Sequence, residues 1–267
     1  MVTMQTLELW DGQISTRVHH AGSGEPVVFL HGAMGLRWDD FLDGLAEQFT
    51  VFAPEHPGTT PGDPDGIKPL DHLWDLVLYY DELFAALGLD SAALIGHSFG
   101  GMVAAEVAAS FPTRASKLVL ISALGLWRDD APIPNVMVMT PEEFVPLLVA
   151  DQSGPLAQTM LTPPDLESEA GQTAVIQSTW SLACTGKFIW PIPDRGLDRR
   201  LHRVTAPTLI VWGHRDNFAR SVYADEFRQR IRDSRVEVME SAGHFPQLEQ
   251  PSRTLELVKG FLQTPSA

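Results

Sequence analysis

A serine, an aspartate and a histidine each follow a short run of apolar residues that is typical of a buried strand. Ser98 lies in the motif GHSFG, Asp216 in VWGHRD and His244 in SAGHFPQLEQP. A serine hydroxyl is a weak nucleophile that needs a base to accept its proton and an acid to orient that base. The chain order Ser, Asp, His is the order of nucleophile-elbow enzymes. The three motifs therefore predict nucleophilic catalysis with Ser98 as the attacking group.

The motif around Ser98 matches G-x-S-x-G, which needs a very sharp turn from a strand into a helix. Gly96 and Gly100 leave room where the strand and the helix nearly touch. The serine then stands in a strained conformation beside a helix N-terminus, whose partial positive charge favours a developing anion. The alternative is a glycine-rich turn with an incidental serine. The apolar run before the motif and the alanine-rich run after it favour the elbow.

Another apolar run ends in the sequence FLHGAMG, at residues 29–35. A loop with two glycines can turn backbone N–H groups toward the site, so the N–H groups of Ala33 and Phe99 are predicted to form an oxyanion hole. Such a donor typically contributes about 3–4 kcal/mol in the transition state. His31 is expected to orient this loop.

Apolar runs and helical patterns alternate along the rest of the chain. The predicted strands are 26–32, 49–58, 92–98, 117–123, 207–213 and 235–241, after a hairpin around Asp11-Gly12. The predicted helices are 70–87, 101–110 and 251–262. Runs that are apolar on both faces are typical of parallel strands, so we predict an α/β fold with a mostly parallel twisted sheet and helices on both faces. The carboxyl ends of parallel strands would gather Ser98, Asp216 and His244 at one edge.

The alternation breaks at residues 125–200, which are rich in proline and lack a strong strand pattern. Short helices fit best there, at 141–149 and 169–183. We interpret this segment as an insertion after the sixth strand.

The composition limits the classes of partner and compartment. The 267 residues carry a formal net charge of −15, which disfavours nucleic acid, and no apolar run reaches the length of a membrane span. With one cysteine and no secretory pattern at the start, a cytoplasmic location is expected. The histidines lack metal-ligand spacing, so neither a metal nor a cofactor is expected. The expected partner is a small-molecule substrate, and the expected state is a monomer or a homodimer.

These motifs, in this order and spacing, resemble the α/β-hydrolase-fold superfamily over nearly the whole chain. The resemblance is to serine hydrolases with a cap domain, such as carboxylesterases and meta-cleavage-product hydrolases. It implies Ser98 as nucleophile, His244 as base and Asp216 as acid, with Ala33 and Phe99 as the oxyanion residues. It also implies a core of residues 1–124 and 201–267 and a helical cap of residues 125–200. Serine at the elbow, in place of aspartate, disfavours dehalogenase and epoxide hydrolase chemistry.

The resemblance places substrate choice in the cap. Its apolar side chains could line a pocket, although they could equally form the core of the cap itself. The predicted pocket residues are His31, Trp127, Met137, Trp180, Phe188, Trp190 and Phe245. The segment holds ten acidic and five basic residues, so an anionic substrate would need a specific arginine.

Several alternatives stay open. In some relatives the acid follows an earlier strand, which would point to Asp129 or Asp130. Hydrolysis of an ester or related acyl bond is the first hypothesis, and carbon–carbon bond hydrolysis of the meta-cleavage-product type is the second. Phe245 stands where such hydrolases commonly have tryptophan, which places that chemistry second. A third hypothesis is a non-hydrolytic member, either a ligand receptor or a cofactor-free oxygenase.

Overall fold

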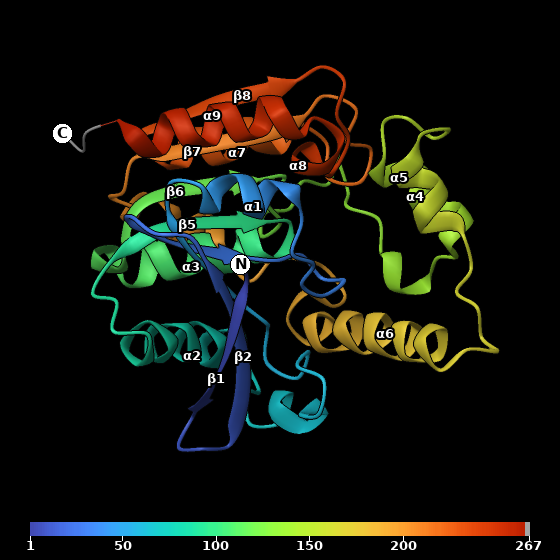
Figure 1. Ribbon diagram of the computed structural model, residues 1–267. Coiled ribbons are helices and arrows are strands. Elements are labelled where there is room, and N and C mark those ends of the chain that lie inside the picture. Colours follow the sequence, from blue (N-terminus) through green and yellow to red (C-terminus); the bar gives the residue numbers. More distant parts are fainter. Residues whose placement is uncertain (265–267) are drawn as a thin grey trace.

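The computed structural model describes residues 1–264 and contains one eight-stranded sheet (Figure 1). The strands lie in the order β1-β2-β4-β3-β5-β6-β7-β8. β1 and β2 pair antiparallel, as do β2 and β4, whereas every pair from β4 to β8 is parallel. The predicted α/β fold with a mostly parallel sheet is therefore confirmed. The strands are β1 (Thr3–Leu9), β2 (Ile14–Ala21), β3 (Pro26–Leu30), β4 (Thr50–Pro54), β5 (Ala92–His97), β6 (Ala115–Ile121), β7 (Thr208–Gly213) and β8 (Ser234–Met239).

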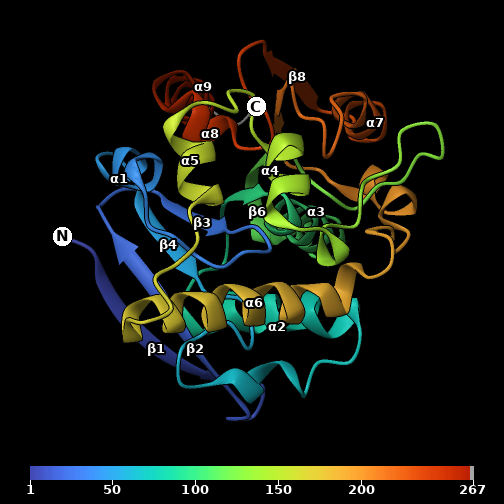
Figure 2. The ribbon, with the colours of Figure 1, turned by 90° about the vertical axis from the view of Figure 1, so that its right-hand side faces the viewer.

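Helices cover both faces of the sheet, as the apolar strands predict (Figure 2). Leu94 of β5 packs into one apolar layer and Ile95 into the other, because successive side chains of a strand point to opposite faces. The first layer includes α2 (Leu73–Ala86), α3 (Phe99–Ser110) and α7 (Val222–Arg230). The second includes α1 (Asp40–Ala46) and α9 (Pro251–Gln263).

Residues with positive φ form the hairpin turn and the turn that ends α2. The hairpin turns through Asp11 and Gly12, both at positive φ, and pairs Leu9 with Ile14. Helix α2 ends before Gly88, which has a φ of +70°, and the next N–H, of Leu89, returns to the carbonyl of Phe84 at 2.9 Å. This left-handed residue satisfies carbonyls that the helix end would leave unpaired.

Some elements differ from the prediction. Helices α1 and α7 are absent from the prediction. Both are short, and they form because their apolar side chains pack on the sheet: Tyr223, Ala224 and Phe227 of α7 are all buried. Strand β8 is not buried on both faces, since it lies at the sheet edge and leaves Val238 42% exposed. The strand predicted at 49–58 ends at Pro54.

The segment between β6 and β7 forms α4 (Pro141–Leu148), α5 (Pro155–Leu161) and α6 (Glu169–Ile189). The first and third match the predicted helices, and α6 runs six residues past the predicted end at 183. Backbone N–H groups of Asn217 and His244, in the loops after β7 and β8, donate to the carbonyls of Leu147 and Leu148 at 3.1 and 2.6 Å. The end of α4 therefore lies at the carboxyl ends of the strands. Within residues 1–264, no helix is long and apolar enough to cross a membrane.

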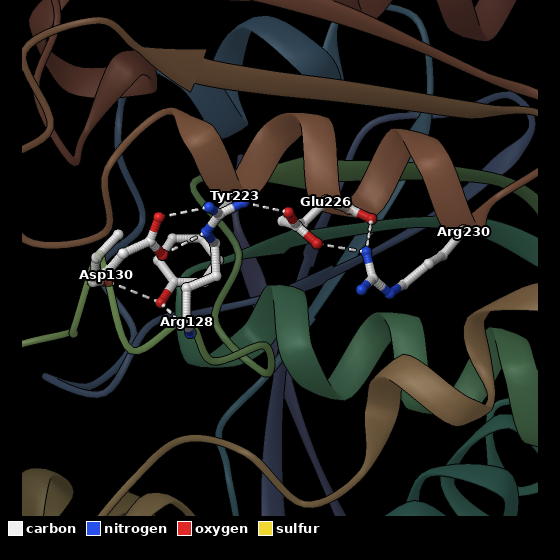
Figure 3. Close-up of polar contacts among 6 residues, drawn as sticks. Arg128, Asp130, Tyr223, Glu226 and Arg230 are labelled. Atoms are coloured by element: carbon white, nitrogen blue, oxygen red, sulfur yellow. Dashed lines mark hydrogen bonds and ion pairs between the residues drawn. The ribbon is translucent and has the colours of Figure 1, made fainter.

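Arginines fix both ends of this inserted segment to the sheet's helices. At its start, Arg128 binds Asp130 and also Glu226 of α7, which in turn binds Arg230 (Figure 3). At its end, Arg200 binds both carboxylate oxygens of Glu106 on α3, at 2.6 and 2.7 Å.

Candidate active site

The structure brings the three predicted residues into one hydrogen-bonded chain. The Oγ of Ser98 lies 2.8 Å from Nε2 of His244, and Nδ1 of His244 lies 2.8 Å from Oδ2 of Asp216. All three side chains are buried. In this arrangement Nδ1–H donates to the carboxylate, which leaves Nε2 free to accept the serine proton.

The loops after β7 and β8 hold the acid and the base. The second carboxylate oxygen of Asp216 accepts the backbone N–H groups of Phe218 and Ala219, at 3.0 and 2.8 Å. These two bonds fix the carboxylate plane, so that Oδ2 faces the imidazole. The ring of Phe218 meets the ring of His244 edge-on, with centroids 4.9 Å apart, and so fixes that ring as well.

The backbone at Ser98 is strained, as the motif predicts. Its φ of 55° and ψ of −117° are conformations that a non-glycine residue rarely adopts. The strain persists because the turn is packed on all sides: a Cβ at Gly96 would lie 2.3 Å from the carbonyl oxygen of Gly100, and a Cβ at Gly100 would lie 2.0 Å from that of Leu30. Such distances allow only glycine.

The third glycine of the motif has a reason that the sequence does not reveal. A Cβ at Gly101 would lie 2.6 Å from the Cβ of Ala123, just past the end of β6. The first turn of α3 therefore packs directly against the neighbouring strand end. Only a small residue at both positions allows this approach.

His97 supports the base. Its Nε2–H donates to the backbone carbonyl of His244 at 2.8 Å. Burial, with a contribution from the nearby His244, lowers the pKa of His97 to about 3. The ring is therefore neutral near neutral pH and acts as a fixed hydrogen-bond donor to the loop that carries His244.

Two more buried histidines hold the loop of residues 31–35. Nδ1–H of His31 donates to the carbonyl of Gly32 at 2.7 Å, and its Nε2 accepts the backbone N–H of His56 at 3.1 Å. The His56 ring donates back to the carbonyl of His31 at 2.8 Å and accepts the hydroxyl of Tyr80. Burial lowers the pKa of His56 to about 4 and that of His31 well below its usual value.

His31 thus orients the loop, as predicted, but both of its ring nitrogens are used there. The predicted oxyanion residues lie on either side of this support. Ala33 follows Gly32 in the loop, and Phe99 is the first residue of α3, with its ring 5.0 Å from that of His56.

The predicted pocket residues fall into two groups. Phe188 of α6 is buried and stacks on Phe99 with ring centroids 6.3 Å apart, and Phe245 lies 5.5 Å from the His244 ring. Met137 packs inside the inserted segment, against Gly186 of α6.

The three predicted tryptophans lie further out. Trp180 and Trp190 are 39% and 47% exposed. The indole N–H of Trp180 donates to the carbonyl of Pro64, and that of Trp127 donates to Asp129 at 2.9 Å in a solvent-exposed contact. The indoles of Trp127 and Trp180 therefore bind groups outside the chain of Ser98, His244 and Asp216.

The geometry favours Asp216 over the alternative acids. Asp130 binds the guanidinium of Arg128 (Figure 3), and Asp129 binds Trp127. Both carboxylates are exposed, whereas Asp216 is bonded to His244 in the interior.

Sequence reasoning missed Glu249, which lies in the short helix α8 (Pro246–Glu249). One of its oxygens accepts the N–H of Gly243 at 2.8 Å, and the other accepts that of Ala150 at 2.7 Å. Partial burial raises the pKa of this carboxyl. Glu249 joins the loop before His244 to the chain after α4. The signal was present in the sequence, as the one acidic residue of the stretch HFPQLEQP, five positions after His244.

The described residues do not meet the requirements of a metal site, and one surface hollow lies near the loops that carry Asp216 and His244. Across residues 1–264, no group of three or more His, Cys, Asp and Glu side chains is arranged to hold a metal ion. A hollow of about 520 Å³ opens beside the loops after β7 and β8, and neither Ser98 nor His244 lines it. Its lining residues are Val149, Ala150, Gln152, His214, Arg215, Asn217, Glu240 and Ser241.

Comparison with known proteins agrees with this architecture. Residues 25–251 match the profile of the alpha/beta hydrolase fold, and the chain belongs to this family. It is 28% identical, over 94% of both chains, to the 2-hydroxy-6-oxo-2,4-heptadienoate hydrolase of Pseudomonas putida.

Solved structures share the fold. One is an esterase from Rhodococcus sp., with a TM-score of 0.78, 21% identity and coverage of 98% of this chain and 99% of that one. Another is a meta-cleavage product hydrolase from Pseudomonas fluorescens, with a TM-score of 0.74, 19% identity and coverage of 97% of both chains.

The packing at the elbow predicts that Gly100→Ala is severely destabilising. The added methyl group meets backbone oxygens of Leu30 and His31 that cannot move independently, so we expect a loss of about 3 kcal/mol in the free energy of unfolding, measured in urea. Gly260→Ala is the matched control, because its methyl group meets nothing within 4 Å and sits in a helix, where alanine is favoured. Equal stability of the two variants would contradict the proposed packing.

The buried neutral state of His97 predicts a pH dependence of stability. Its pKa is about 3 in the folded chain against 6.5 ordinarily, so the unfolded chain binds more protons between these values. The free energy of unfolding therefore falls as the pH decreases through this window. In His97→Gln, which keeps an N–H donor, the fall should be shallower by up to about 1.4 kcal/mol per pH unit.

Urea denaturation at several pH values between about 7 and about 5 measures this slope. His214→Gln, at an exposed position, is the control and should keep the slope of the parent protein. An unchanged slope in His97→Gln would show that His97 is not held neutral.

Proposed function

We propose that this protein is a serine hydrolase that cleaves an ester or a related acyl bond of a mostly apolar small molecule. The observation that carries the proposal is the buried chain from Ser98 through His244 to Asp216, with 2.8 Å at both links. A strained serine next to a helix N-terminus, with a base in hydrogen-bond contact, has the arrangement that acyl transfer needs.

The proposal assigns a role to each residue. Ser98 Oγ attacks the carbonyl carbon while Nε2 of His244 takes its proton, and Asp216 stabilises the imidazolium that forms. The N–H groups of Ala33 and Phe99 bind the oxyanion. His244 then returns the proton to the leaving alcohol, and water activated by the same nitrogen releases the acid from Ser98.

The surroundings of the serine support an apolar substrate. Aromatic rings of Phe99, Phe188, Phe218 and Phe245 lie beside the chain of catalytic groups. We propose that residues 125–200 form a cap over the site and that residues 1–124 and 201–267 form the catalytic core. Phe188 of the cap then contacts Phe99, whose N–H is assigned to the oxyanion hole. A substrate that touches Phe188 would therefore lie next to the reacting carbonyl.

Carbon–carbon bond hydrolysis is the second candidate. It is favoured by the relative of 28% identity, whose name describes hydrolysis of a 2-hydroxy-6-oxo-dienoate. The same serine, histidine and aspartate serve both chemistries, so the site itself does not separate them. Ester hydrolysis ranks first because Phe245, rather than a tryptophan, follows His244, and because the loop HGAMG has fewer serine and glycine residues than such hydrolases commonly carry.

Removal of the nucleophile is the direct test. Ser98→Ala should lower kcat for 4-nitrophenyl ester hydrolysis by about 10⁴-fold or more and should abolish covalent labelling by a fluorophosphonate. The control is Ser241→Ala, at an exposed serine, which should keep both activities. Labelling of Ser98→Ala at the rate of the parent protein would overturn the assignment.

A further inference from the structure

Four of the five basic residues of the inserted segment pair with carboxylates. Arg128 binds Asp130 and Glu226, and Arg200 binds the buried Glu106. Lys187 faces Asp71 at 3.5 Å, and Arg199 is 82% exposed next to Asp198. Each of these four cations of the segment therefore faces a carboxylate.

The fifth, Arg195, bonds only to backbone carbonyls. Its guanidinium donates to Trp190, to Ile192 at 3.3 Å and to Asp194 at 3.2 Å. These bonds hold the loop that follows α6. Within residues 1–264 Arg195 has no carboxylate partner, so it is the cation of this segment that a ligand could recruit most easily.

The core places a carboxylate next to the histidine that contacts the serine. In the described part of the chain, the hydrogen bonds of Ser98, His244 and Asp216 involve no lysine or arginine. The Asp216 carboxylate lies inside the site, and Glu249 lies behind it, close enough for the two charges to repel. The neighbouring rings of His56 and His97 are neutral because burial lowers their pKa values to about 4 and about 3.

The buried polar groups that remain free are uncharged. Within residues 1–264, the buried side-chain atoms without a hydrogen-bond partner are Ser122 Oγ, Ser181 Oγ and Gln247 Oε1. Ser181 lies on the inner face of α6, where its Oγ is 3.1 Å from the position a Cβ would take on Gly35 of the oxyanion loop. Such a hydroxyl can bind a carbonyl or another hydroxyl, but alone it cannot compensate a buried carboxylate.

We propose that this site is selective for uncharged substrates and rejects a carboxylate on either side of the scissile bond. A carboxylate brought into this site would lose its water and find aromatic rings, a neutral hydroxyl and the Asp216 charge. The selectivity rests on the proposed function, since it concerns the same serine. It also distinguishes this chain from a hydrolase whose substrate is a dienoate, because a dienoate carries such a carboxylate.

Matched pairs of esters test the proposal. Methyl 4-acetoxybenzoate and 4-acetoxybenzoate place the charge on the leaving group, and the 4-nitrophenyl esters of monomethyl adipate and of adipate place it on the acyl group. With each rate normalised to hydroxide-catalysed hydrolysis, we expect kcat/KM to be at least about 100-fold higher for the neutral member of each pair. A ratio near one, or a preference for the anion, would overturn the proposal.

Two arginine variants test whether an arginine side chain binds the carboxylate of the anionic esters. Arg195 lacks an ion-pair partner, and Arg37 follows the oxyanion loop at an exposed position. Arg195→Ala and Arg37→Ala should leave the neutral-to-anionic ratio unchanged. A selective loss of anionic turnover in either variant would identify an anion site and contradict the proposal.

Fluorophosphonate titration separates this proposal from the one on which it rests. A protein that is labelled at Ser98 but hydrolyses both members of each pair equally retains the serine hydrolase function and loses the charge selectivity. A protein that is not labelled at all loses the proposed function itself.

Discussion

The approach of helix α3 to the sheet is the constraint on which the site depends. The helix begins so close to β3 that a single Cβ at Gly100 would lie 2.0 Å from a backbone oxygen of Leu30. This contact holds Ser98 at a φ of 55° and projects its hydroxyl out of the turn. His244 and Asp216 can meet that hydroxyl because their loops leave parallel strands at the same edge of the sheet.

Three buried histidines surround this turn, and none of them takes the catalytic position. His97 holds the backbone of His244, while His31 and His56 hold the loop of residues 31–35. Because burial keeps them uncharged, they supply directed hydrogen bonds without adding positive charge. The support of the site and its proposed preference for neutral substrates therefore have one physical origin.

The inserted segment is joined to the same framework. Its first and last parts are fixed by Arg128 and Arg200, and the end of α4 accepts N–H groups from the loops of Asp216 and His244. Glu249 adds a carboxylate that binds both the loop before His244 and the chain after α4. A shift of α4 would thus disturb Asp216 and His244 together, so the position of this helix is coupled to the hydrogen bonds that reach Ser98.

The sequence by itself determined the strand alternation, the elbow glycines and the identity of the serine, histidine and aspartate. These features depend on local apolar runs and on the short motifs at the ends of those runs. Both can be recognised in the sequence without knowledge of tertiary contacts. Only the tertiary structure decided why Gly101 is needed, what Glu249 binds and that the tryptophans lie partly in solvent. It also decided that Arg128 and Arg200 are paired, because their partners Glu226 and Glu106 are distant in sequence and meet them only when the chain folds.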